Sequence, residues 1–219
     1  MCDSLSMLGV SVASDLSWNE HTSPVAKSAA RKMGFLFRSK RLFTPLHLLT
    51  LYKAQNRPFL EYGSHLWRGA SKYSLATLNT IQKRVIRLID DSALTDSLDS
   101  PAHRRNVSAL SLYYRYSHSR CSDELKSVIP SKACFAGRSR FADSQHSFAV
   151  KLEKCRTTSF AITFVPMTSR NWNSLSASIF PCTYNLQTFK TGRTNTYAST
   201  LSRDQLSLLF GNGMVFRDP

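Results

Sequence analysis

The chain has 219 residues, of which 42% are hydrophobic and 20% are charged, and this composition is ordinary for a protein that folds around a core. It contains 29 lysine and arginine residues against 14 aspartate and glutamate residues, so its formal net charge is +15 and its pI is near 10.0. The five cysteines are odd in number and scattered, and no segment approaches the roughly 20 apolar residues of a membrane span, which argues against a disulfide scaffold and a membrane protein. We expect an intracellular protein of the nucleus and cytoplasm, with no membrane partner.

The positive charge is concentrated in one part of the chain. Between Val25 and Asp90 there are thirteen basic residues and two acidic ones, Glu61 and Asp90. A solvated basic surface or a basic patch that faces a membrane would show a similar excess. We favour nucleic acid as the partner, because this charge falls on segments with helical periodicity that also carry aromatic residues.

The first expected elements are a strand at Leu5 to Val12, where apolar residues partly alternate, and a polar connector at Asp15 to Thr22. Because a lone strand needs partners, a chain that starts with one is expected to be cut from something larger. Ser23 followed by Pro24 is a typical helix start, so the first helix should run from there to about Lys40.

The first predicted helix has two distinct faces. Its apolar face carries Val25, Ala29, Met33 and Leu36. A basic stripe on another face consists of Lys27, Arg31, Arg38 and Arg41. We expect this stripe to meet phosphate groups; a plain solvated face is the alternative interpretation of the same pattern.

Thr44 and Pro45 repeat the helix-start pattern and open a central helix. Its row of residues at helical spacing consists of Leu48, Tyr52, Gln55, Phe59, Tyr62 and Leu66. Because the row continues through Pro58, the sequence predicts one kinked helix instead of two. An unrelieved proline inside a helix costs about 3 kcal/mol, so packing on both sides has to hold the kink. We expect four aromatic residues here to lie in the core instead of stacking on bases: Tyr52, Phe59, Tyr62 and Trp67.

A third amphipathic helix follows a turn at Gly69 to Tyr73. Its buried row is expected to be Leu75, Leu78, Gln82, Val85 and Ile89, and the basic residues off that row are Lys83, Arg84 and Arg87. Three such helices can bury a shared core. The adjacent Asp90 and Asp91 imitate the metal-binding pair of polymerases, but two-metal phosphoryl transfer needs carboxylates from separate strand positions. A polar turn that ends the helix explains the pair.

The second half of the chain is predicted to be a smaller α+β region. The polar connector Ser92 to Ser100 is the expected domain boundary, a fourth helix should run from Ala102 to about Ser119, and Ser122 should cap a shorter one. Apolar residues alternate at Phe148 to Leu152 and again at Phe160 to Phe164, which predicts a β-hairpin.

Two further helices are expected near the end. Trp172, Leu175 and Ile179 fit a short helix before Pro181, and Asn185 can cap a last one. From about residue 200 onward we expect a flexible tail.

The sequence offers little evidence for catalysis. Cys121, Cys134, His146 and Cys155 have the order of a zinc site, but every interval is longer than structural zinc sites use, so we expect no metal. The six histidines are scattered and do not indicate an active site. The sequence also shows no glycine-rich phosphate loop and no paired catalytic carboxylates. The residues alone favour a basic, mostly helical binding module.

Most of the chain resembles the end of the reverse transcriptase of jockey-like non-LTR retrotransposons. In the first hundred residues the resemblance rests on Leu8 to Val10, Leu16 to His21, Lys27 to Arg41, Leu51 to Trp67, Ile81 to Arg84 and Arg87 to Ile89. It continues through Arg104 and Arg105, Leu110 to Tyr114, Cys121 to Leu125, Trp172 to Leu175, Phe180 and Pro181, and Tyr184 to Lys190. It covers about Leu5 to Tyr197.

The resemblance implies a thumb and the segment that follows it, which grip the RNA template and the nascent DNA. The palm with its Tyr-x-Asp-Asp loop, which binds magnesium, and the endonuclease would lie upstream of Met1. We therefore expect no catalytic residue and no cofactor in this chain, and no polymerase activity from it alone.

Several positions depart from the family pattern. Asn56 stands where a small apolar residue is expected, and Met167, Asn171 and Ser176 are further departures. A buried Asn56 needs a hydrogen-bond partner or costs about 1–3 kcal/mol.

Two alternatives to a nucleic-acid-gripping fragment stay open. One is a reused helical scaffold that docks a protein, which predicts an exposed apolar patch, and the other is a non-functional remnant.

The resulting prediction is a mainly α fold in which a helical thumb-like bundle precedes a small α+β region with a hairpin. Its expected parts are residues 1–22 from the palm side, the three-helix bundle 23–91, the C-terminal domain 92–199 and the tail 200–219. The expected partners are RNA template, RNA–DNA hybrid or DNA, and the expected phosphate contacts are Lys27, Arg31, Arg38, Arg41, Lys83, Arg84 and Arg87.

Overall fold

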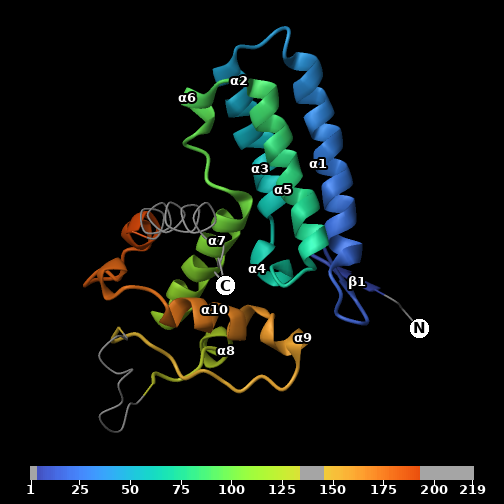
Figure 1. The fold of residues 1–219 in the computed structure, drawn as a ribbon. Coiled ribbons are helices and arrows are strands. Elements are labelled where there is room, and N and C mark those ends of the chain that lie inside the picture. The colour runs from blue at the N-terminus through green and yellow to red at the C-terminus, as the bar shows by residue number, and fades with distance from the viewer. Residues whose placement is uncertain (1–3, 134–145, 193–219) are drawn as a thin grey trace, which may run out of the picture. The chain divides into compact units, whose positions relative to one another are not determined.

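The computed structural model describes residues 4–133 and 146–192, and these residues are mainly helical (Figure 1). They form two compact units. Unit 1 consists of Met1–Ala109 with Leu152–Ser169, and unit 2 of Leu110–Lys151 with Arg170–Pro219. The predicted functional boundaries at 22, 91 and 199 stay predictions, and the predicted tail lies outside the described residues. None of the described helices is long and apolar enough to cross a membrane.

Unit 1 begins with a β-hairpin, where the sequence predicted a single strand. Strands β1 (Ser4–Met7) and β2 (Val10–Ala13) pair antiparallel, with Met7 opposite Val10. The two turn residues Leu8 and Gly9 have φ values of 50° and 78°, and positive φ at both positions is the two-residue turn that suits the twist of a hairpin. Leucine is rare in that conformation, which is why the turn was missed.

Helix α1 (Asn19–Ser39) starts four residues before the predicted Ser23. The amide and the hydroxyl of Thr22 both donate to the Trp18 carbonyl oxygen at 2.8 Å, and these bonds close the first turn. Pro24 therefore lies inside the helix, at an exposed position where water can solvate the carbonyl that the proline leaves unpaired. The predicted apolar face is confirmed, because Ala29 and Leu36 are buried and Val25 and Met33 pack against the core.

The central helix is continuous through the proline, as predicted, but it contains a wide turn. Its parts are α2 (Pro45–Leu51), the π-helical turn η1 (Tyr52–Asn56) and α3 (Arg57–Glu61). Thr44 caps it by accepting from the His47 amide. The Arg57 amide donates to the Tyr52 carbonyl oxygen, five residues back, and Pro58 follows directly. The extra residue in this turn places the proline in a helix that is already widened.

This wide turn also shifts the buried row of the helix. Leu48 and Tyr52 are buried as predicted, but Gln55 and Tyr62 are exposed, and Asn56 and Leu60 take the inward positions. One added residue rotates the following side chains by about 100°, which the regular period could not anticipate. The helix ends at Glu61, and Gly63, whose φ is 61°, precedes α4 (Ser64–Trp67).

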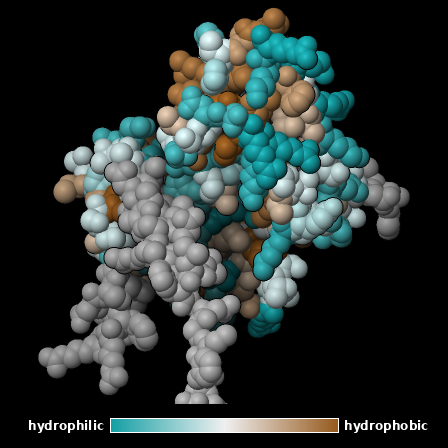
Figure 2. Space-filling view, turned by 45° about the horizontal axis from the view of Figure 1, so that its top comes forward, coloured by the Kyte–Doolittle hydropathy of each residue, from teal (hydrophilic) through white to brown (hydrophobic). Residues whose placement is uncertain are grey.

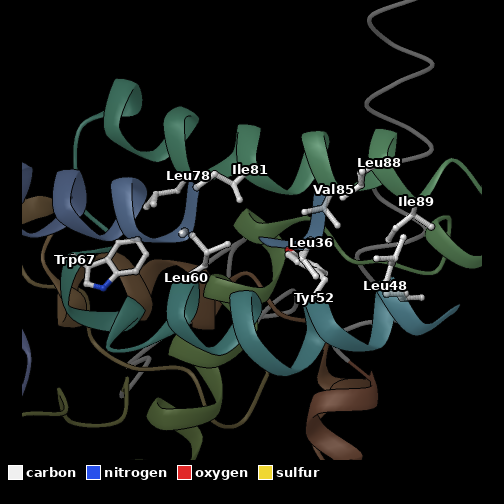
Figure 3. Close-up of a cluster of buried hydrophobic side chains, with 12 residues drawn as sticks. Leu36, Leu48, Tyr52, Leu60, Trp67, Leu78, Ile81, Val85, Leu88 and Ile89 are labelled. Atoms are coloured by element: carbon white, nitrogen blue, oxygen red, sulfur yellow. The ribbon is translucent and has the colours of Figure 1, made fainter. Parts of the chain in front are cut away.

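Helix α5 (Lys72–Ile89) completes the bundle and agrees with the prediction. It packs along α1, and its inward row meets the central helix (Figures 1 and 3). The core of unit 1 consists of Ala29, Leu36, Leu48, Leu49, Tyr52, Leu60, Trp67, Leu78, Ile81, Val85, Leu88 and Ile89. The predicted core positions of Tyr52 and Trp67 are thus confirmed. Phe59 is only partly buried, and the prediction for Tyr62 is wrong: its hydroxyl donates to the Leu8 carbonyl oxygen at 2.8 Å and ties the hairpin turn to the bundle.

The two aspartates after α5 end that helix, as predicted, and also begin a short helix that was not predicted from the sequence. Asp90 has a φ of 54°, which stops α5, and the Asp91 carboxylate accepts from the Leu94 amide at the start of α6 (Ser92–Thr95). Helix α7 (Pro101–Ser117) follows and belongs to unit 1 up to Ala109. Unit 1 also contains α9 (Thr158–Ala161) and the first part of α10 (Phe164–Asn173).

Unit 2 has an aromatic core. The Tyr114 ring stacks on Phe189 with 4.4 Å between centroids, and Tyr113 lies 5.0 Å from Trp172. Unit 2 also contains helix α8 (Asp123–Ser127), the 3-10 turn η3 (Ala177–Ile179) and a helical stretch at 186–192. The Asn185 carboxamide oxygen accepts from the Thr188 amide, so the predicted cap is confirmed.

The predicted C-terminal hairpin is wrong. Residues 160–164 are largely helical, because the Thr157 hydroxyl caps α9 by accepting from the Phe160 amide. Among the described residues, the backbone near Val150 forms a single antiparallel bridge, to Lys132. The side chain of Asn173 forms hydrogen bonds with the Val150 backbone. The Asn173 carboxamide accepts from the Val150 amide at 2.9 Å and donates to its carbonyl at 2.8 Å, as a neighbouring strand would. The Asn173 side chain therefore satisfies the hydrogen-bonding groups of the Val150 backbone, which the alternating pattern had predicted to pair with a second strand.

Candidate nucleic-acid interface

All seven predicted phosphate contacts have exposed side chains. On α1, Lys27, Arg31 and Arg38 lie within about 40° of one another around the helix axis at 3.6 residues per turn. Ala29 and Leu36 lie on the opposite side of that axis, in the core. Arg41 follows just beyond the helix end. The basic stripe is therefore the outward face of α1, held there by burial of the other face.

Helix α5 presents the second group in the same way. Lys83 and Arg87 are one turn apart and exposed, with Arg84 beside them, while Ile81 and Val85 point into the core. Helix α5 contains no acidic residue, so every charged residue on its outward face is basic. The structure leaves both groups free to meet a ligand, and whether they do so stays a prediction.

Few acidic residues lie near the two basic faces in the sequence. Between Glu20 and Asp90 the sequence has one acidic residue, Glu61. Its carboxylate pairs with Arg104 and, at 3.4 Å, with Arg57. None of the seven predicted contacts forms an ion pair with any residue that the structure describes. No carboxylate of the described residues is paired with them, so their charge attracts solvent ions, which a polyanion can displace.

Arg104 is basic but structural. Its guanidinium donates to the Glu61 carboxylate, to the Asp99 carbonyl oxygen and, at 2.8 Å, to the Gln82 side-chain oxygen. The Tyr52 hydroxyl donates to the same Gln82 oxygen at 2.9 Å. Burial raises the pKa of Tyr52, an effect that the nearby Arg104 charge partly offsets. This network joins the central helix, α5 and α7 inside unit 1.

Arg105 is also held inside the fold. It donates to the Asn79 side-chain oxygen at 3.0 Å, and its guanidinium lies 5.8 Å from the Trp67 ring. Burial, together with the positive charges of Arg104 and Arg68, lowers its pKa to about 10, so it remains charged at neutral pH. Neither arginine is available to phosphate groups without opening the bundle.

A hollow of about 320 Å³ adjoins Lys27 at the point where α1 passes the start of α5. Its walls are rich in hydroxyl groups and contain no carboxylate: Asn19, Thr22, Ser23, Ala26, Lys27, Tyr73, Ser74 and Thr77. The Ser74 hydroxyl donates to the Asn19 side-chain oxygen at 3.0 Å, which holds the two helices together there. Hydroxyl groups and amides commonly bind nucleic-acid phosphates beside lysine. Tyr73, 84% exposed, was not predicted as part of such a site.

A second feature is an apolar tip, which we define as Phe37, Leu42, Phe43 and Leu46; the scaffold alternative predicts an exposed apolar patch, but the sequence did not locate one here. Leu42 is 83% exposed and Phe37 68% exposed. Backbone bonds from Phe43 and Leu42 to the Ser39 carbonyl oxygen shape the connection between α1 and α2 that carries them. Figure 2 turns the top of Figure 1 forward and shows brown side chains among teal ones there. The sequence signal was present, because apolar and basic residues interleave from 35 to 43.

The described residues contain no cluster of three histidine, cysteine or carboxylate side chains that could hold a metal ion. The zinc ligands considered in the sequence are not gathered there, and Cys134 lies outside the described residues. Comparisons with models of protein families, with curated proteins and with solved structures find no match to this chain.

Proposed function

We propose that this chain is a nucleic-acid-gripping module, equivalent to the thumb and following segment of a non-LTR retrotransposon reverse transcriptase. It binds an RNA template, an RNA–DNA hybrid or DNA through phosphate groups and does not perform polymerase chemistry alone. The proposal rests on one observation above all: the outward faces of α1 and α5 carry exposed cations, and these cations form no ion pair with any residue that the structure describes. The family resemblance of the sequence supports the same conclusion.

Phosphate contacts of this kind give affinity with little reading of base sequence. Each one releases about 0.9 counterion from duplex DNA, so the logarithm of the binding constant falls linearly with the logarithm of salt concentration. A cationic helix face that is merely solvated shows no tight binding and no such slope. Salt dependence therefore distinguishes the two interpretations of the stripe.

The test replaces three residues of the α1 stripe together, Lys27→Gln, Arg31→Gln and Arg38→Gln. Binding of the full-length chain to a labelled RNA–DNA hybrid is measured by fluorescence anisotropy between about 50 and 200 mM salt. Loss of three contacts should make the salt slope shallower by about 2 to 3. Affinity at low salt should fall for all sequences alike.

A matched control removes the same net charge elsewhere, through Lys151→Gln, Lys154→Gln and Arg156→Gln, all of which are exposed. The control should keep the wild-type slope. If both triple variants reduce the slope equally, binding depends on net charge and not on the α1 face. If wild-type protein does not bind at low salt, the proposed function is wrong.

A further inference from the structure

The apolar tip is an unusual surface for a folded protein. Exposed hydrophobic residues that are scattered singly are normal, but several large ones gathered together mark an interaction site. Here four of them fall within the ten residues from 37 to 46, and the most exposed, Leu42, leaves 83% of its surface in water. Fold stability does not require this arrangement, because the core of unit 1 forms without these side chains.

The charges around the tip restrict what can cover it. Arg38, Lys40 and Arg41 lie between Phe37 and Leu42 in the sequence, and all three are exposed. The sole acidic residue between Glu20 and Asp90 is Glu61, which is engaged by Arg104. A partner that complements the tip is therefore anionic and also offers apolar surface.

The basic stripe favours one such partner over the others. It extends from Lys27 to Arg38, about 16 Å along α1 at 1.5 Å per residue, and leads directly to the tip. A lipid surface that bound the apolar tip would contact the end of α1, and the basic stripe along the side of the helix would remain unused. A protein that docked on the apolar tip alone would also leave the stripe uncovered, because the tip lies at the end of α1 and the start of α2. A linear polyanion can follow the stripe and reach the tip.

We propose that the apolar tip holds unpaired bases of a single nucleic-acid strand whose phosphates lie along the basic stripe of α1. The inference rests on the proposed function and specifies its ligand as a strand with an unpaired segment. Only unpaired bases expose the ring faces that aromatic side chains bind, and Phe37 and Phe43 supply such side chains beside three cations. Leu42 and Leu46 extend the apolar surface.

The test uses the double variant Phe37→Leu with Phe43→Leu in the full-length chain. Leucine keeps the surface apolar but removes the aromatic faces, and both positions are exposed, so the fold is retained. Fluorescence anisotropy compares a labelled 20-nucleotide single strand with a blunt duplex of the same sequence at one salt concentration. The variant should bind the single strand about tenfold more weakly and the duplex as wild type does.

The control is Phe160→Leu, a phenylalanine of α9 that is about as exposed as Phe43 but lies outside α1 and the apolar tip, and it should change neither affinity. Unchanged single-strand binding in the double variant, or equal losses for both ligands, overturns the inference while the proposed function stands. Wild-type binding to vesicles with anionic lipid that Leu42→Ser abolishes would also overturn it, in favour of a membrane surface. So would a wild-type dimer in light scattering that Leu42→Ser converts to monomer. Wild-type protein that binds neither strand nor duplex removes the proposed function itself.

Discussion

Replacing Asn56 by leucine should stabilise the fold. The Asn56 side chain is fully buried in the wide turn of the central helix, and its Oδ1 atom has no hydrogen-bond partner among the described residues. Its Nδ2 atom reaches only the Ala29 carbonyl oxygen, at 3.4 Å. Leucine has the same branched shape and number of side-chain heavy atoms, so Asn56→Leu removes the amide without opening a cavity.

The size of the gain follows from two opposing contributions. A buried acceptor without a partner costs about 1–3 kcal/mol. An intramolecular hydrogen bond contributes about 1 kcal/mol net at its normal length, and a donor–acceptor distance of 3.4 Å lies beyond the usual range, so the bond to Ala29 is worth less than that. Asn56→Leu should therefore raise the free energy of unfolding by about 1–2 kcal/mol.

Urea denaturation measures this change as a higher midpoint with an unchanged slope of free energy against urea. The matched control is Gln55→Leu, the same kind of substitution at an exposed position of the same turn, which should shift the free energy of unfolding by less than about 0.5 kcal/mol. A lower midpoint for Asn56→Leu would refute the reasoning, because it would mean that the amide is satisfied in solution.

Three further predictions concern stability. Arg104→Gln should cost about 3 kcal/mol in urea denaturation, because it leaves the Glu61 carboxylate without its buried partner; a loss below about 1 kcal/mol would contradict this. Burial lowers the pKa of His146 below its ordinary 6.5, so the unfolded chain binds more protons at this residue than the folded chain does. The free energy of unfolding should therefore fall as the pH drops below about 6.5. The variant His146→Asn should reduce the steepness of that fall by up to about 1.4 kcal/mol per pH unit, and an unchanged pH profile would contradict this prediction. Gly69→Ala should lower the melting temperature, since a Cβ there would lie 2.5 Å from the Ile162 carbonyl oxygen. Gly34→Ala on α1 should raise it through helix propensity, because a Cβ there would meet the Arg38 side chain at an ordinary contact distance of 3.7 Å; equal shifts for the two variants would contradict the packing.

Local patterns predicted the bundle where they depend on neighbouring residues alone. Thr44 with Pro45 marked a helix start, the period of α5 marked its buried row, and the paired Asp90 and Asp91 marked a helix end. Each of these features is decided within a turn or two of helix. The structure therefore reproduces them with little change.

The errors arise where a contact distant in sequence decides the backbone. The Asn173 side chain accepts a hydrogen bond from the Val150 amide, 23 residues away in the sequence. The alternation of apolar residues around Val150 does not reveal this contact, so it could not exclude a hairpin. The wide turn before Pro58 shifted the buried row by one residue, which a regular period cannot encode. The basic stripe was found because charge is visible in the sequence, whereas the apolar tip was missed because exposure depends on the packing of the bundle.

The most direct test of the account is the salt dependence of binding by the wild-type chain. With a labelled RNA–DNA hybrid, the binding constant should fall with salt concentration at a logarithmic slope of about −6, as seven phosphate contacts at about 0.9 counterion each predict for a duplex. A slope near −6 that becomes shallower in the α1 triple variant supports a basic interface on α1 and α5. Absence of binding at low salt, or binding without a salt slope, would contradict it.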